Sequence, residues 1–113
     1  MPAQRSNRGK TRLSLVDPLF THEVAEVAAM GANKYDRDNW FKGQTYETVL
    51  DSMKRHLEAF ETGEAVDHES KLSHLAHVAC NVMFLMYYER NPEKYGKYDN
   101  RMYHKQTRDE DEV

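Results

Sequence analysis

The sequence predicts an all-α fold, a small bundle of three main helices flanked by tails. Three segments carry the start and stop signals of helices, and no segment shows the apolar–polar alternation of a half-buried strand. A length of 113 residues suits a single domain. We expect a basic N-terminal arm over residues 1–12, a helical domain over 13–92 and a polar tail over 93–113, partly packed on the bundle or on a partner.

The composition limits both the core and the possible partners. Sixteen Lys and Arg against nineteen Asp and Glu give a net charge of −3, which argues against nucleic acid held by a basic surface. The chain has eight Leu, eight Val and four Phe but no Ile, so a second subunit or a bound metal would supplement its small core. It has a single cysteine and no apolar stretch of ~18 residues. We therefore expect a cytoplasmic protein without a membrane partner.

The first helix places a carboxylate among apolar side chains. Asp17 caps this helix, which is expected to end at about Met30 or Lys34. At 100° per residue, Glu23 falls in the middle of the apolar face, where an unpaired charge is costly. Glu26 lies one turn further on, and two carboxylates at this spacing can share one divalent ion. Pairing of Glu23 with a basic side chain and solvation of Glu26 are the alternatives.

The second helix is amphipathic. Thr45 caps it, and it continues through Glu61, with Gly63 as a natural stop. His56 lies at the edge of its apolar stripe, where it could join a site or be half buried at a helix boundary. The stripe consists of Tyr46, Val49, Leu50, Met53, Leu57 and Phe60.

The third helix is expected from about Lys71, with Ser70 as its cap, to Arg90. It is apolar nearly all round, which predicts a central, buried position. Three polar side chains share one line along it: His74, His77 and Asn81. They form either a hydrogen-bond ladder or a site. Histidines at i and i+3 on an inward face, opposite an inward Glu23, favour a metal site.

The segments between the helices add candidates. In the first connection, Tyr35 and Trp40 offer aromatic faces for a base, Asn39 offers an amide and Lys34 offers charge for phosphate. The alternative for Trp40 is that it plugs back onto the core. In the second connection, Asp67 is expected to act as a cap rather than in a site. His68 and His104 are expected at the surface.

Several short motifs, taken in order, are similar to those of one family of small phage proteins. The motifs are Glu23-Val24-Ala25, Gly31-Ala32-Asn33-Lys34-Tyr35, Asn39-Trp40, Arg55-His56-Leu57 and the stretch from Leu72 to Asn81. From about Lys10 to Glu89 the chain resembles the dATP/dGTP diphosphohydrolase N-terminal domain family. This family is related to the MazG-like all-α nucleotide pyrophosphohydrolases.

The resemblance implies hydrolysis of a deoxynucleoside triphosphate, dATP or dGTP, between its α- and β-phosphates. It further implies Mg²⁺ or Mn²⁺, a homodimer or homotetramer with sites between subunits, and the host cytoplasm for a phage protein. Glu23-x-x-Glu26 fits the first acidic motif of MazG-like enzymes, but His74-x-x-His77 stands where Glu-x-x-Asp is expected. Histidines suit Mn²⁺ or another transition ion better than Mg²⁺. Alternatively, they bind phosphate or act as acid and base.

In this interpretation each candidate residue has a role. The expected metal ligands are Glu23, Glu26, His74 and His77. The expected catalytic residues are Glu23, Glu26, His56 and His77, and the expected substrate-binding residues are Lys34, Tyr35, Asn39, Trp40 and Asn81. A non-catalytic nucleotide-binding or phage adaptor module is the alternative. A His-Asp phosphohydrolase is disfavoured, because only the reversed order Asp67-His68 occurs.

Overall fold

Three long helices form the body of the protein. A computed structural model describes residues 1–103. The long helices are α1 (Pro18–Lys34), α2 (Tyr46–Glu61) and α3 (His74–Arg90), followed by the short α4 (Pro92–Tyr95). Single 3₁₀ turns complete the described part: η1 (Leu13–Leu15), η2 (Asn39–Lys42) and η3 (Gly96–Tyr98). The predicted all-α class is confirmed, whereas the expectations for His104 and for the rest of the polar tail beyond residue 103 lie outside the described residues.

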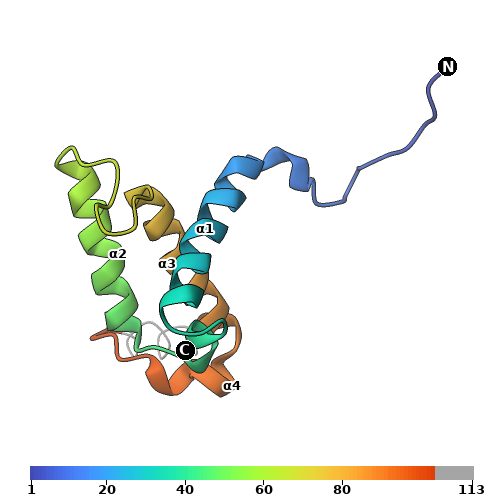
Figure 1. Ribbon diagram of the computed structural model, residues 1–113. Helices are drawn as coiled ribbons and strands as arrows, with labels where there is room; N and C mark the ends of the chain where they lie inside the picture. Colours follow the sequence, from blue (N-terminus) through green and yellow to red (C-terminus); the bar gives the residue numbers. More distant parts are fainter. Residues whose placement is uncertain (104–113) are drawn as a thin grey trace.

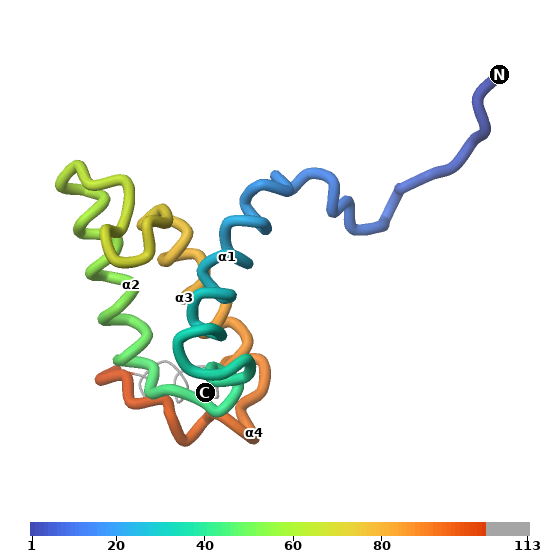
Figure 2. The backbone as a smooth tube through the Cα atoms, in the orientation of Figure 1, coloured from blue at the N-terminus to red at the C-terminus, as the bar shows by residue number. Residues whose placement is uncertain are grey.

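The third helix organises the bundle. Helix α3 packs against both α1 and α2, and α4 turns back beneath them (Figure 1). The N-terminal arm leaves the start of α1 and projects away from the helices (Figure 2). No helix of residues 1–103 is long and apolar enough to cross a membrane.

Local capping chemistry sets the start of α1 and α2, as the sequence predicts. Asp17 Oδ1 accepts a hydrogen bond of 3.0 Å from the Leu19 amide. Thr45 Oγ1 accepts one of 3.4 Å from the Thr48 amide. These side chains satisfy amide groups that have no partner within the first turn of a helix.

The predicted start of the third helix is wrong by three residues. Ser73, not Ser70, is the N-cap, and its Oγ accepts from the amides of Leu75 and Ala76 at 3.1 and 3.3 Å. Lys71 adopts a left-handed φ of 64°, which a right-handed helix cannot contain. Residues 64–72 therefore form a loop instead of an extra helical turn.

Tyrosine hydroxyls hold the first connection against the lower core. Tyr88 donates to the Trp40 carbonyl at 2.6 Å, and Tyr95 donates to the Phe41 carbonyl at 2.7 Å. Because both rings are fully buried, these bonds satisfy polar groups that would otherwise lie unpaired in the core. Burial also raises the pKa of Tyr88 to about 12. The apolar-poor chain thus uses tyrosine where other cores use aliphatic side chains.

Helix α1 meets α3 through only part of the predicted apolar face. Val27 is buried against Ala76 and Cys80, whereas Leu19 and Phe20 are 65% and 54% exposed. Glu23 is exposed as well, so the expectation that its carboxylate is buried in the core is wrong for this chain. Val24 and Ala28 pack beside Val27, so α1 contacts α3 through its smaller apolar side chains and leaves the larger ones exposed.

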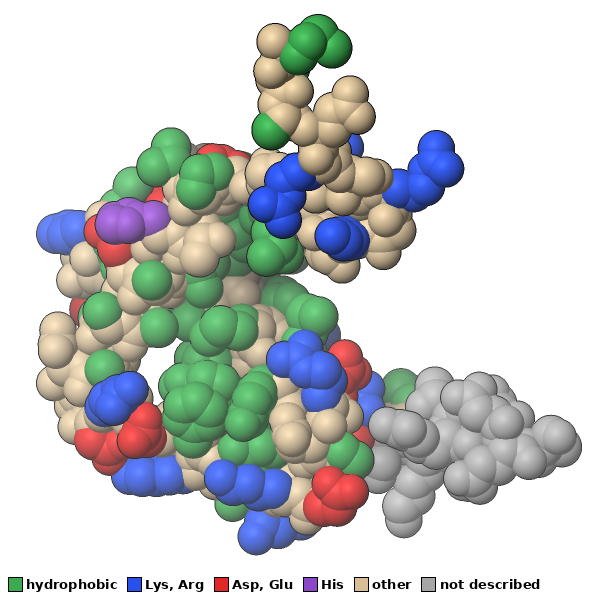
Figure 3. Space-filling model, turned by 90° about the vertical axis from the view of Figure 1, so that its right-hand side faces the viewer, with side chains coloured by type: hydrophobic (Ala, Val, Ile, Leu, Met, Phe, Trp, Pro, Cys, Tyr) green, Lys and Arg blue, Asp and Glu red, His purple; other side chains and the backbone are tan. Residues whose placement is uncertain are grey.

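One side of α3 is also uncovered, contrary to the expectation of a helix buried all round. Leu75, Val82 and Met86 on α3 are exposed. Together with Phe20 and Val24 of α1 they line a groove, which we call the α1/α3 groove. Figure 3 shows hydrophobic side chains gathered in a hollow beneath the projecting arm.

Candidate metal centre

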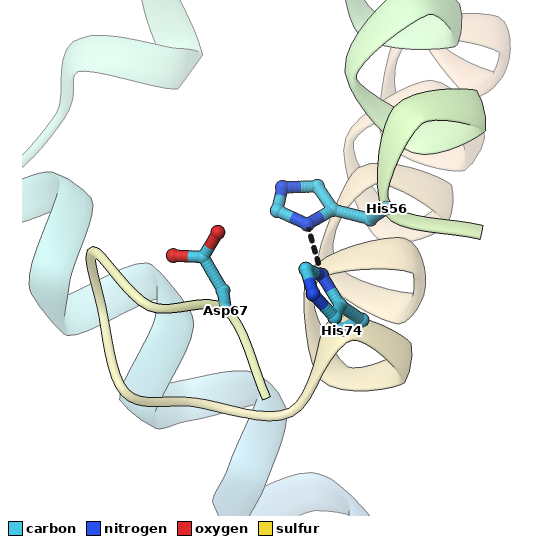
Figure 4. A group of neighbouring side chains, drawn as sticks. All are labelled: His56, Asp67 and His74. Carbon is cyan, nitrogen blue, oxygen red and sulfur yellow. Dashed lines mark hydrogen bonds between the residues drawn. The ribbon is translucent and has the colours of Figure 1, made fainter. Parts of the chain in front are cut away.

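Two histidines and one aspartate converge at the upper end of α2 and α3. His56 comes from α2, His74 from the first turn of α3 and Asp67 from the loop between them (Figure 4). The Nδ1 atoms of the two histidines lie 2.9 Å apart. One potential ligand atom from each of the three residues lies within 4.8 Å of the others. Among residues 1–103, this trio is the one group of three or more His, Cys, Asp or Glu side chains close enough together to hold a metal ion.

Each member of the trio is held by a second contact. Glu64 Oε1 lies 3.3 Å from His74 Nε2, on the side of the ring away from His56. The Ser70 amide donates to Asp67 Oδ2 at 2.8 Å. The ring of His77 stacks on that of His56, with centroids 4.2 Å apart and an interplanar angle of 5°. The trio therefore rests on neighbours that fix its orientation.

His77 lies beside the trio and has a partner of its own. Its Nε2 is 2.7 Å from Ser70 Oγ, a bond in which either atom can donate. Ser70 also donates its amide to Asp67 within the loop, so this serine joins the loop carboxylate to a histidine of α3. The predicted site histidines His74 and His77 are both buried, at 4% and 7% exposure.

The surroundings of His56 and His77 favour their neutral rings, and those of Asp67 favour its ionised carboxylate. Burial lowers the pKa of His56, and the neighbouring His77 and His74 lower it further. Burial likewise lowers the pKa of His77. Burial acts to raise the pKa of Asp67, but hydrogen bonds from Ser70 outweigh it and leave this pKa below its usual value. Unprotonated nitrogen and carboxylate oxygen are the forms that bind cations and accept protons.

The two glutamates of the first helix do not join this cluster. Glu23 and Glu26 are both exposed on α1. Glu26 lies 3.9 Å from His22, one turn earlier on the same helix. Neither belongs to the group of potential ligands found among residues 1–103. Their metal and catalytic roles stay predictions.

Lys34 is tied to the same loop as the cluster. Its Nζ lies 3.2 Å from Glu69 Oε1, and this bond raises the pKa of Lys34. Glu69 directly precedes Ser70, the residue that contacts both Asp67 and His77. The predicted phosphate-binding lysine is therefore at the rim of the cluster, attached through an exposed ion pair.

Three of the predicted substrate-binding residues share a second cavity. Tyr35, Asn39 and Trp40 line a hollow of about 140 Å³ together with small residues of α1. Trp40 also stacks on Phe84 of α3, with centroids 4.9 Å apart. It thus packs against the core and presents part of its ring to the cavity, which combines the two alternatives weighed for it.

Asn81 bridges two helices. It is 9% exposed, and its Nδ2 donates to Ser52 Oγ of α2 at 3.3 Å. Asn81 lies one turn after His77 on α3, and its hydrogen bond crosses the bundle to α2. A substrate-binding role for Asn81 stays a prediction.

The sequence reasoning missed Asp67, Glu64 and Ser70 as parts of the site. Asp67 was expected to cap a helix, but its carboxylate holds a turn within the loop instead. The available signal was the acidic stretch of residues 64–69 lying between His56 and His74. Loops that place carboxylates beside helical histidines supply the mixed donors of many metal sites.

Comparison with known proteins gives this arrangement a context. Over 91 residues the chain is 43% identical to a protein named dATP/dGTP diphosphohydrolase from Salmonella phage PMBT28. The match covers 80% of this chain but only 31% of that relative. No solved structure matches the chain. Residues 1–101 match the family described as dATP/dGTP diphosphohydrolase, N-terminal, and the chain belongs to this family.

Proposed function

We propose that this chain supplies the hydrolytic site of a deoxynucleoside triphosphate diphosphohydrolase. Purine substrates, dATP or dGTP, would be cleaved to the monophosphate and pyrophosphate. The observation that carries the proposal is the convergence of His56, Asp67 and His74 in one cluster, in a chain of this family. The relative that bears the activity in its name is about three times as long as the matched region, so that relative has further parts.

The cluster provides the groups that phosphoanhydride hydrolysis needs. Its two imidazoles and one carboxylate fit a divalent cation, Mn²⁺ rather than Mg²⁺, which would neutralise charge on the phosphate oxygens. Burial lowers the pKa of His77, which favours its neutral ring, so His77 can accept a proton from the attacking water, whereas His56 would hold the cation. Lys34 would exchange its ion pair with Glu69 for one with a substrate phosphate.

The nucleoside would occupy the cavity next to η2. Tyr35 is exposed and offers its ring for stacking, and Asn39 offers an amide for a base edge. Because Tyr88 and Tyr95 fix the backbone of this connection, the cavity is formed before substrate arrives. Such a reaction would take place in the host cytoplasm, where these nucleotides are present.

We further propose that the protein assembles as a homodimer or homotetramer. The α1/α3 groove is apolar and uncovered, and a second copy presents the same surface. Two such faces related by a twofold axis bury each other, which is the common arrangement of homodimers. This association would supply the burial that the small core lacks.

Turnover with each deoxynucleoside triphosphate tests the function. Purified protein is incubated with Mg²⁺ or Mn²⁺, and released pyrophosphate is measured. We expect purine substrates to be preferred and His77→Asn to lower kcat by about 100-fold or more, the usual contribution of a general base. Absence of pyrophosphate from folded, metal-loaded protein with every nucleotide would refute the proposal. Full activity of Glu23→Ala would remove Glu23 from the catalytic set.

The arm supports one alternative, a non-catalytic nucleotide-binding or phage adaptor module. Residues 1–12 carry Arg5, Arg8, Lys10 and Arg12 without an acidic side chain, and they project from the body (Figure 1). An adaptor would lose function on deletion of residues 1–12 and would tolerate His77→Asn. The diphosphohydrolase shows the opposite pattern.

A further inference from the structure

We propose that His56, Asp67 and His74 bind one transition-metal ion, and that Glu64 is a positioning residue for His74. This inference deepens the proposed function and rests on it for the role of the ion, although ion binding is measured independently. The ligand atoms are Nδ1 of each histidine and one carboxylate oxygen of Asp67.

The separation of the two imidazole nitrogens suits a shared ion. Two nitrogens bound to one metal at ~2.1 Å lie ~3.0 Å apart in octahedral and ~3.4 Å apart in tetrahedral geometry. The Nδ1 atoms of His56 and His74 are 2.9 Å apart. To hold one ion, each ring must rotate so that its Nδ1 lone pair points at the ion instead of at the other ring. Without an ion, the same distance is bridged by a single hydrogen bond, in which one ring donates and the other accepts.

The contact with Glu64 settles which nitrogen of His74 has a free lone pair. Glu64 Oε1 lies 3.3 Å from His74 Nε2, and a carboxylate is an acceptor, so this contact places the N–H of a metal-binding His74 on Nε2. Nδ1 of His74 then carries a lone pair that faces His56. A histidine that donates its outer N–H to a carboxylate while its other nitrogen binds metal is a recurrent arrangement in metalloproteins.

The other two ligands are also held in place. Asp67 accepts the Ser70 amide through Oδ2, which fixes the carboxylate at the turn of the loop. The His56 ring stacks in parallel on His77, whose Nε2 is held by Ser70 Oγ. His56 can therefore exchange its Nδ1 proton for one on Nε2 without turning the ring away. Preformed ligands of this kind reduce the ordering that metal binding must otherwise impose.

The donor set selects the class of ion. Mg²⁺ prefers oxygen ligands and retains several waters, whereas imidazole nitrogen favours Mn²⁺, Fe²⁺, Co²⁺ and Zn²⁺. A site with two histidines and one carboxylate leaves positions open for water or for a phosphate oxygen. The ion would thus be held mainly by this chain and would remain accessible to substrate.

Direct binding of Co²⁺ to the metal-free full chain tests the inference. Calorimetry and the visible absorption of bound Co²⁺ are expected to give one ion per chain. His56→Asn, Asp67→Asn and His74→Asn are each expected to weaken binding by more than about 100-fold. Glu64→Ala is expected to weaken it by about 10- to 100-fold, as outer-shell partners do, whereas Glu64→Gln, which keeps an acceptor oxygen, retains most of the affinity.

His68→Asn is the matched control. His68 is on the same loop, lies 3.8 Å from Glu64 and is exposed, but it is outside the trio. Its substitution should leave Co²⁺ binding unchanged. Equal loss of affinity in the His68 and His74 variants, or loss in Glu23→Gln instead, would overturn the assignment.

A measurement on the unmodified protein covers the case in which a variant fails to fold. The hyperfine-shifted proton spectrum of the Co²⁺-loaded chain is expected to show exchangeable N–H signals from two ligand histidines. An excess of Mg²⁺ should not displace the Co²⁺. A spectrum without ligand histidine signals contradicts the inference.

Turnover assays separate this inference from the proposed function. If Co²⁺ binds at the trio but no nucleotide is hydrolysed, the metal site stands and the diphosphohydrolase fails. If hydrolysis with Mg²⁺ survives in His56→Asn and Asp67→Asn, the function stands and the trio is not its metal site.

Discussion

Cys80 shows how strongly a single buried position can change a side chain's chemistry. Its thiol is 1% exposed between α1 and α3, and burial raises its pKa to about 11. At pH 8 only roughly one molecule in a thousand then carries the reactive thiolate. We expect Ellman's reagent to react slowly with the folded chain and rapidly with the chain unfolded in urea. Equally fast reaction in both states would show that α1 does not cover Cys80.

At the same scale, helical periodicity located some site residues and misplaced others. His74 and His77 were predicted because polar side chains aligned on an apolar helix stand out. Glu23 was misplaced because periodicity shows which residues share a face but not which face meets a neighbour. Asp67 was assigned a capping role, since its approach to the histidines depends on how an irregular loop folds back.

At the scale of elements, Ser70 and Ser73 precede α3 and make different contacts: Ser73 with the first amides of the helix, Ser70 with the His77 ring. Ser73 caps the helix, so Ser73→Ala is expected to cost about 1 kcal/mol in the free energy of unfolding and to speed hydrogen exchange at the Leu75 and Ala76 amides. Ser70→Ala should leave that exchange unchanged and instead alter the NMR signals of the His77 ring. The contrary pattern would place the helix start at Ser70.

The helix boundaries explain which parts of the fold were accessible from sequence. Asp17 and Thr45 act within their own first turn, so local chemistry was sufficient to predict both starts. The start of α3 depends on the loop, where Val66 pairs with Ser73 and Lys71 takes a left-handed conformation. That arrangement depends on the whole connection, so the start of α3 cannot be predicted from any single residue.

At the scale of the molecule, the α1/α3 groove is the surface through which we propose that two copies associate. Val82→Glu places a charge in the groove and is expected to shift the protein toward the monomer in light scattering coupled to size-exclusion chromatography. The control is Leu57→Glu, at a partly exposed position on α2 outside the groove, which should not change the mass. A monomeric unmodified protein, or equal effects of both variants, would contradict the assembly.

The order of the cluster residues along the chain has a consequence for folding. His56, Glu64, Asp67, Ser70, His74 and His77 all belong to the segment formed by the end of α2, the loop and the start of α3. Bringing them together requires closing only a short loop, which carries a small entropic cost. Local contacts of this kind form fast, ahead of those that join distant segments. The α2–loop–α3 hairpin can therefore form before α1 docks. The cluster of histidines and Asp67 would then be assembled without any contact from α1.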